Sequence, residues 1–424
     1  MNLGMLVIIL LLSLSILGVP IGFALGIGTM AAILYGDLPT MVLPQKVFTG
    51  CDSMPLLAIP FFLLAGNVMS RGITQRILTF SNALLGSVQG GLAAVTVVAS
   101  SIFAAISGSG VATVSAIGGM TIPAMKQEGY DPSFAAAVSS VASILGPIIP
   151  PSIFLIVYGS VTETSIGQLF MAAVIPGLMV SLGLVGYVLF YAKKRNFPKH
   201  ERVDLKTFGA IALDCSWALF MPVLILGGIF GGIFTATEAA AVSVVYALLV
   251  CLFIYKGLTW RELPQILFDS AITTSTIMVL LALSKASSWI VVTSKLPLTV
   301  VNMFSAFTDS AVVILLLLNG LLLVVGMLME GNAAIVMLSP LIMPLLKTYG
   351  ISPIHFGVVL ALNLCIGLVT PPVGVCLLLG NEIAGSKFDR TLAAALPMIG
   401  LSLFVLALVT YVPAFTGWLP SLMY

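Results

Sequence analysis

Two interruptions in an apolar part of the chain place small polar residues where a membrane helix would otherwise continue. The first is Ser107-Gly108-Ser109-Gly110, between two apolar arms, and the second is residues 146–152, which include three prolines. Proline removes a backbone donor and clashes with the preceding helical turn. Since lipid tolerates freed peptide groups only inside protein or around a wet cavity, such breaks are the best sequence indicators of a transporter's binding site.

Both interruptions occur again about 220 residues later. The second copy has residues 329–332 (Met-Glu-Gly-Asn) in place of the first tip and residues 367–372 (Gly-Leu-Val-Thr-Pro-Pro) in place of the second break. A constant shift of 221 aligns Pro123 with Pro344, Lys126 with Lys347, Gly129 with Gly350, Pro132 with Pro353, Gly146 with Gly367 and Pro150-Pro151 with Pro371-Pro372. Spacing of this kind predicts two copies of one structural unit.

Composition defines the class of protein. The 424 residues are 60% hydrophobic and 8% charged, whereas a soluble domain has about 25% charged residues. The apolar runs are too long for barrel strands, so we expect an all-α polytopic membrane protein embedded in a lipid bilayer. The net charge of +2 gives no indication of a nucleic-acid partner, and the five cysteines show no motif spacing.

The elements that must position the interruptions follow from the apolar runs. We expect repeat 1 to cover residues 1–192, a cytoplasmic linker residues 193–210, and repeat 2 residues 211–424. Each repeat has a re-entrant helical hairpin (91–125 and 311–346) followed by a broken span (133–160 and 353–380). Residues 3–35 predict two short spans or, alternatively, a single kinked helix. Residues 36–52 predict a loop, residues 53–70 a span, and residues 72–89 a helix along the membrane surface.

The odd number of membrane crossings in each half predicts that the two repeats have inverted topology. Five crossings per half place the start of the second half on the opposite face of the membrane, because a hairpin returns to its own side. The positive-inside rule agrees with this model. Only Lys46, Lys285, Lys295 and Lys347 of the 17 basic residues then fall outside the cytoplasmic side.

Hairpins of opposite orientation bring their tips together near the midplane, where helix ends offer free amides and carbonyls. Carbonyl and hydroxyl oxygens suit Na⁺, and N-terminal amides suit a carboxylate. We expect two or more Na⁺ ions, held by one set from the first repeat (Ser107, Ser109, Gly146, Pro150) and one from the second (Gly326, Asn332, Gly367, Thr370). For the substrate we expect Ser109, Gly110, Pro150, Glu330, Gly331 and Pro371. The alternative is that these glycines and prolines only allow close helix packing.

Ionisable residues in the apolar runs have two interpretations each. Glu330 at the second tip predicts a cation-linked or gating role, or an N-terminal helix cap. Glu238 follows Thr235-Ala236-Thr237 and indicates a cap. Lys285 either snorkels or assists an anion, and His355 is expected to be a satisfied polar group rather than a proton relay. No enzyme signature and no P-loop is present, so we expect neither an enzyme nor an ATP site.

The stretch from Gly108 to Ile153 resembles the large membrane subunit of tripartite ATP-independent periplasmic (TRAP) transporters. Four further segments are similar to that family: PIGFALG from Pro20, FFLLAGNVMSRG from Phe61, TATEAAA from Thr235 and GLVTPPVGV from Gly367. The family often has Thr-Pro-Thr-Glu where this chain has Thr235-Ala236-Thr237-Glu238. The similarity covers essentially the whole chain.

This resemblance implies a Na⁺-driven uptake permease with an elevator-type, ion-transporter-like fold in the bacterial inner membrane. It also implies a separate small four-helix membrane subunit (Q type), a periplasmic substrate-binding protein (P type), and an organic-acid substrate such as a C4-dicarboxylate or sialic acid. Two alternatives remain open at this point. One is a self-sufficient Na⁺/dicarboxylate symporter, and the other is an intramembrane enzyme, which would need an acidic or metal cluster.

Overall fold

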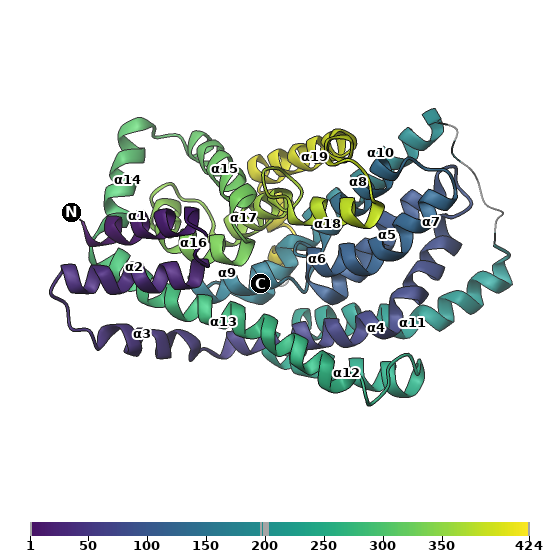
Figure 1. The fold of residues 1–424 in the computed structure, drawn as a ribbon, viewed down its shortest axis with the longest axis horizontal. Helices are drawn as coiled ribbons and strands as arrows, with labels where there is room; N and C mark the ends of the chain where they lie inside the picture. The colour runs from purple at the N-terminus through teal and green to yellow at the C-terminus, as the bar shows by residue number, and fades with distance from the viewer. Residues whose placement is uncertain (1, 196, 198–202, 423–424) are drawn as a thin grey trace.

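Every regular element is helical in the computed structural model, which describes residues 2–195, 197 and 203–422 (Figure 1). Eight of the described helices are long and apolar enough to cross a membrane. The elements of the first half are α1 (Leu3–Ile16), α2 (Ile21–Tyr35), α3 (Val42–Cys51), η1 (Met54–Leu57), α4 (Ala58–Leu85), α5 (Gly91–Ser107), α6 (Gly110–Thr113), η2 (Val114–Gly118), α7 (Gly119–Gln127), α8 (Pro132–Ala142), η3 (Ser143–Leu145), α9 (Ile153–Thr162) and α10 (Ile166–Arg195).

The second half repeats this order. Its elements are α11 (Leu205–Phe230), α12 (Ala236–Leu249), η4 (Val250–Ile254), α13 (Leu263–Thr293), α14 (Leu296–Phe307), α15 (Ala311–Leu328), α16 (Gly331–Thr348), α17 (Pro353–Gly367), α18 (Val375–Ala384), α19 (Phe388–Tyr411), α20 (Ala414–Gly417) and η5 (Pro420–Leu422). The linker predicted at residues 193–210 lies partly outside the described residues, because residues 196 and 198–202 are not among them.

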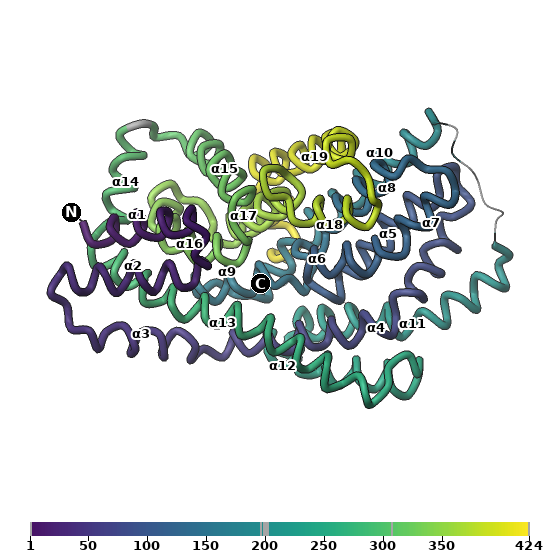
Figure 2. The backbone as a smooth tube through the Cα atoms, in the orientation of Figure 1, coloured from purple at the N-terminus to yellow at the C-terminus, as the bar shows by residue number. Residues whose placement is uncertain are grey.

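Helix bounds follow the repeat spacing. Adding 221 to the bounds of the second arm of the first hairpin, 110–127, gives the bounds of α16, and adding it to Pro132 gives the first residue of α17. The Pro150–Pro151 and Pro371–Pro372 bonds are both cis. In Figure 2 the arms α5 and α7 lie to the right of α6, and the arms α15 and α16 lie to its left. That the two repeats are inverted across the membrane stays a prediction.

The broken spans form the centre of the molecule. Residues 133–142 of α8 are all buried, as are residues 355–367 of α17. Long helices lie outside them, with α4, α11, α12 and α13 along the lower edge of Figure 1 and α19 and α10 along the upper edge. The elements that are interrupted in the sequence are therefore the ones that the rest of the chain encloses.

Two predicted elements differ from the structure. Residues 42–51 form the helix α3 rather than a loop, and the predicted span 53–70 and surface helix 72–89 are one continuous helix, α4. Arg71 does not end α4, because its side chain is exposed while Ile73 and Ile77 below it are fully buried. A long basic side chain can lie along the helix surface and keep its charged end in a polar environment.

Candidate functional site

The first hairpin has its tip where the sequence predicts it. Helix α5 ends at Ser107, Gly108 has left-handed backbone angles, and Ser109 is the extended N-cap of α6. The Ser109 hydroxyl accepts a hydrogen bond from the Ala112 N–H at 3.4 Å, which satisfies one of the unpaired donors of the new helix. The second arm therefore starts with a capped helix N-terminus.

The second tip repeats this geometry with a carboxylate. Glu330 is the extended N-cap of α16, and its Oε2 accepts from the Ala333 N–H at 3.0 Å while its Oε1 accepts from the Asn332 side-chain amide at 2.8 Å. The capping interpretation of Glu330 is confirmed. The Asn332 carbonyl oxygen Oδ1 is buried and has no hydrogen-bond partner among the described residues. Tip two thus carries one carboxylate and one unused acceptor.

A new helix begins after each break, so each break creates a helix N-terminus. In the first, Ser152 accepts from the Leu155 N–H at 3.3 Å and donates to the Pro147 carbonyl, so α9 starts with a side-chain cap. In the second, α18 starts after Gly374, and no side chain caps it. Thr370 donates its hydroxyl proton to the Ile366 carbonyl at 2.7 Å.

Both hairpins pack directly against the breaks. A Cβ added at Gly146 would lie 2.5 Å from the Ser109 carbonyl carbon and 2.8 Å from the Gly110 nitrogen. The residue that corresponds to it, Gly367, would clash in the same way with the backbone of Gly326 in α15. Because only hydrogen fits in each gap, these two glycines hold the hairpins and the breaks in backbone contact.

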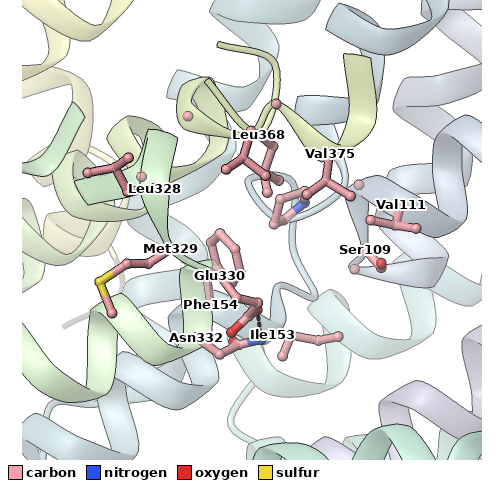
Figure 3. A pocket seen from close by; sticks show the side chains of 17 residues that line it. Ser109, Val111, Ile153, Phe154, Leu328, Met329, Glu330, Asn332, Leu368 and Val375 are labelled. Atoms are coloured by element: carbon pink, nitrogen blue, oxygen red, sulfur yellow. Dashed lines mark hydrogen bonds between the residues drawn. The ribbon is translucent and has the colours of Figure 1, made fainter. Parts of the chain in front are cut away.

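A cavity of about 340 Å³ lies where both tips and both breaks meet (Figure 3). In the close-up, Glu330 and Asn332 lie on one side of Phe154, and Leu368 and Val375 lie on the other. The lining comprises Gly108, Ser109, Gly110, Val111, Pro147, Ile153, Phe154, Gly326, Leu328, Met329, Glu330, Asn332, Gly367, Leu368, Val373, Gly374 and Val375.

The predicted site residues divide into two groups. Six of them line this cavity, namely Ser109, Gly110, Gly326, Glu330, Asn332 and Gly367. Six lie outside its lining: Ser107, Gly146, Pro150, Gly331, Thr370 and Pro371. Ser107 lines a second cavity, and Gly331 packs against the ring of Phe154. The assignment of all twelve as ion or substrate ligands stays a prediction.

The second cavity, of about 910 Å³, lies between the hairpins and the helices α2, α4 and α13. It shares Ser109, Glu330 and Asn332 with the first, and α4 contributes Asn67, whose amide donates to Ser270 of α13 at 2.8 Å. The sequence did not predict that α2, α4 and α13 line a cavity, nor that Phe154 and Val375 line the first cavity. The only signal for the latter two is their place directly after a break.

The site has one ionisable side chain among the described residues. It is Glu330, which lines both cavities. A small cation can be held there by the Glu330 carboxylate, the Asn332 oxygen and backbone carbonyls, and a carboxylate can be held by helix N-termini. The geometry therefore suits the binding of a cation together with a small anion.

Other ionisable residues are used structurally. Glu238 and Thr235 form a complete capping box at the start of α12, which confirms the cap. His355 is a satisfied polar group, with Nδ1 2.7 Å from the Thr416 hydroxyl and Nε2 3.1 Å from the Thr410 carbonyl. Lys285 is exposed on α13.

Structural comparison agrees with a transporter fold. The YdaH transporter from Alcanivorax borkumensis matches with a TM-score of 0.65 at 15% identity, over 88% of this chain and 88% of its own. MtrF from Neisseria gonorrhoeae matches with a TM-score of 0.60 at 10% identity, over 89% of this chain and 85% of its own. At these identities the likeness concerns the fold alone.

Sequence comparison identifies the family. Residues 8–415 match the model of the tripartite ATP-independent periplasmic transporter, DctM component. A C4-dicarboxylate TRAP transporter large permease protein from Pseudomonas aeruginosa is 39% identical over 93% of this chain and 92% of its own, and a sialic acid TRAP transporter large permease protein from Vibrio cholerae is 37% identical over 97% of each.

An isethionate TRAP transporter permease protein from Oleidesulfovibrio alaskensis is 41% identical over 94% of this chain, which spans 63% of that relative's length. These relatives are permease proteins and not enzymes. The chain belongs to the DctM family and is a TRAP transporter large permease subunit, a multi-pass protein of the bacterial inner membrane.

Proposed function

We propose that this permease takes up an organic acid by coupling its transport to Na⁺ in an elevator-type mechanism. The observation that carries the proposal is the 340 Å³ cavity in which two hairpin tips and two helix breaks meet. Such discontinuous helices are where transporters of several folds bind their substrate and coupling ions.

Na⁺ coupling is supported by the oxygen atoms at the tips. Asn332 Oδ1 is an acceptor with no partner among the described residues, and the Glu330 carboxylate lies beside it. An unpaired buried acceptor is unfavourable unless a cation or water completes its coordination. A Na⁺ ion at this point would satisfy Asn332 and offset the negative charge of Glu330.

An organic anion is supported by the helix N-termini and by the relatives, whose names include isethionate, C4-dicarboxylate and sialic acid. The elevator mechanism is supported by the packing of the first hairpin on α8 and of the second hairpin on α17. The 910 Å³ cavity lies between the hairpin tips and the helices α2, α4 and α13. A unit with a continuous buried core can move as a body past such a wall.

The proposal includes two protein partners, a periplasmic substrate-binding protein that delivers the acid and a small membrane subunit. Outer helices of the second half have large exposed apolar side chains, such as Phe220 on α11, Val245 on α12 and Phe268 on α13. Lipid or another membrane protein must cover this surface. We place the small subunit there.

Reconstitution into liposomes tests the proposal. Uptake of a radiolabelled acid is expected only when the permease, the small subunit, the binding protein and an inward Na⁺ gradient are all present. Replacing Na⁺ by choline, or omitting one partner, serves as the control. Uptake without a Na⁺ gradient would rule out the coupling, and uptake by the permease alone would favour a self-sufficient symporter.

A further inference from the structure

Corresponding positions of the two halves surround the 340 Å³ cavity. Most of its lining residues fall into pairs at the shift of 221, among them Ser109 with Glu330 and Phe154 with Val375. The two tips and the two breaks thus place equivalent backbone positions around one space. Where the side chains of a pair differ in size, the two sides of the cavity must differ in shape.

The pair formed by Phe154 and Val375 differs in how much space it fills. Both residues stand in the first turn of the helix that follows a break, α9 or α18, and both line the cavity. Phe154 is 6% exposed, whereas Val375 is 44% exposed. A phenyl ring is larger than an isopropyl group, so the first half fills at this position what the second half leaves open.

The Phe154 ring closes the second tip. It packs on Gly331, the first residue of α16, where an added Cβ would lie 2.7 Å from Cε2 and 2.8 Å from Cε1 of the ring. Glu330 and Asn332, which flank this glycine, lie beside the ring in Figure 3. Because only a hydrogen atom fits between the tip and the ring, no group of a solute can enter there.

No side chain covers the first tip in the same way. The glycine that corresponds there is Gly110, and the three atoms nearest to an added Cβ are the Ser143 carbonyl oxygen at 3.2 Å, Cys376 Sγ at 3.3 Å and Leu368 Cδ1 at 3.4 Å. None of them belongs to Val375, although Val375 lines the cavity together with Gly110. The open part of the cavity therefore lies beside the first tip.

We infer that the solute binds beside the first tip, in the space that Val375 leaves open, and that Val375 limits the size of the solute. Phe154 keeps the corresponding space at the second tip closed and separates the solute from Glu330 and Asn332. The inference deepens the proposed function and rests on it for the use of this cavity by the solute. It predicts that a larger side chain at position 375 excludes large solutes and that a smaller one admits them.

Thiol labelling tests the space without a known solute. Single cysteines replace Leu368, which lies with Val375 on one side of the Phe154 ring, or Met329 at the second tip, in a Cys51→Ser background of the purified complex with the small subunit. Val375→Phe should slow the reaction of Leu368→Cys with benzyl methanethiosulfonate severalfold, because the added ring occupies the space that the reagent must enter. The rate at Met329→Cys should not change. Equal rates at Leu368→Cys with and without the ring would overturn the inference.

A double-mutant cycle tests whether Phe154 closes the second tip. Gly331→Ala should lower the melting temperature of the purified complex, because the new methyl group meets the ring. In a Phe154→Val background the same substitution should lower it less. Phe154→Leu replaces Phe154→Val if the latter is too unstable to purify. An equal loss in both backgrounds would show that the ring does not close the tip and would contradict the inference.

Binding measurements test the selection by size. Isethionate, succinate and N-acetylneuraminate, in order of increasing size, are titrated into the purified complex by calorimetry. Of any two of these acids that bind, Val375→Phe should weaken the larger about tenfold more than the smaller, and Val375→Ala should shift the ratio the other way. Val312→Phe is the matched control, because Val312 on α15 is 60% exposed and lies outside the lining of both cavities. Unchanged ratios in both Val375 variants would overturn the inference.

Comparing Na⁺ with choline separates this inference from the proposed function. If the ratios change as expected but binding is equal in Na⁺ and in choline, the size selection stands and the Na⁺ coupling fails. If binding requires Na⁺ but Val375→Phe changes neither the ratios nor the labelling rates, the coupling stands and the size selection fails. If the wild type binds none of the three acids, the proposed class of solute fails, and the labelling rates decide on the space beside Val375.

Discussion

Two glycines show how closely single residues determine this site. Gly146 and Gly367 stand at corresponding places in the two halves, and each lies against the backbone of a hairpin. Overpacking a close-packed interior costs about 1–3 kcal/mol, because the neighbouring backbone has to move. The distance between each tip and its break, and with it the shape of the cavity, therefore depends on the absence of one methyl group.

Gly146→Ala should consequently lower the thermal stability of the purified protein and reduce uptake, with a loss of about 1–3 kcal/mol in the free energy of unfolding. Gly119→Ala on the second arm of the first hairpin is the matched control, because no atom lies within 4 Å of the added Cβ. We expect that variant to keep both stability and uptake. Wild-type stability of Gly146→Ala would show that the tip can move away without cost.

Removing an oxygen from the tips or from the second break tests the predicted Na⁺ ligands. Ser107→Ala, Asn332→Ala and Thr370→Ala should each raise the Na⁺ concentration for half-maximal uptake about 5- to 150-fold, corresponding to a lost interaction of about 1–3 kcal/mol. Thr348→Ala, an exposed threonine on α16, is the control. If all three variants keep the wild-type Na⁺ dependence at normal protein levels, the tips do not hold the coupling ions.

Sequence reasoning found polar and conformationally special residues of the site but missed apolar ones. Ser109, Glu330 and Gly367 stand out because they lie in the interruptions that recur about 220 residues apart, and all three line the cavity. Phe154 and Val375 do not stand out, since phenylalanine and valine are ordinary in a membrane helix. Only the folded chain shows that they line the cavity, so the apolar character of the site was not predictable.

At the scale of elements, the breaks in the helices were predictable from the sequence, whereas the continuity of α4 was not. Glycine and proline act locally, so the tips and the broken spans follow directly from the sequence. Arg71 indicated a helix end, but α4 continues past it because Ile73 and Ile77 are buried against neighbouring helices. Whether a charged residue ends a helix depends on tertiary packing, which the periodicity of apolar residues alone does not reveal.

One contact between elements joins the two halves at the mouth of the first hairpin. The Lys126 ammonium at the end of α7 donates to the Ala384 carbonyl at the C-terminus of α18, 2.7 Å away. A cation is favourable at a helix C-terminus, where carbonyls have no helical partner. This contact holds the second arm of the first hairpin to the helix that begins at the cavity.

Because the Lys126 side chain is exposed, Lys126→Met should destabilise the protein by about 0.5–1.5 kcal/mol, the range for a typical hydrogen bond. The repeat supplies the control, because Lys347 occupies the corresponding position at the end of α16 and is likewise exposed, but its side chain makes no hydrogen bond to another described residue. Lys347→Met should change stability by less than about 0.5 kcal/mol, as is usual for a surface substitution. Thermal unfolding of both variants in detergent gives the comparison, and equal destabilisation would remove Lys126 as a link between the halves.

In the molecule as a whole, the bounds of the second hairpin arm and the start of the following helix recur at a shift of 221, and the two hairpin tips meet in one cavity. Sequence predicted the units because proline, glycine and lysine positions recur. It did not predict the 910 Å³ cavity beside them, which arises where α2, α4 and α13 face the hairpins and leaves no recurring residue pattern. How the units are oriented across the membrane is a separate question, and labelling can answer it.

Inverted repeats with a cytoplasmic linker make a specific prediction for single cysteines. Arg195→Cys and Asp204→Cys lie within the linker and should react with a membrane-impermeant maleimide only after spheroplasts are permeabilised. Asp37→Cys and Ser310→Cys should react in intact spheroplasts, because the parity model places them on the outer side. All four positions are exposed. Cys51 is the exposed native cysteine and the other four are buried, so a Cys51→Ser background suffices as the unlabelled control.

Labelling of all four variants in intact spheroplasts would indicate leaky membranes. Labelling of the linker positions alone would reverse the orientation, and labelling of one linker position with one outer position would rule out the inverted arrangement.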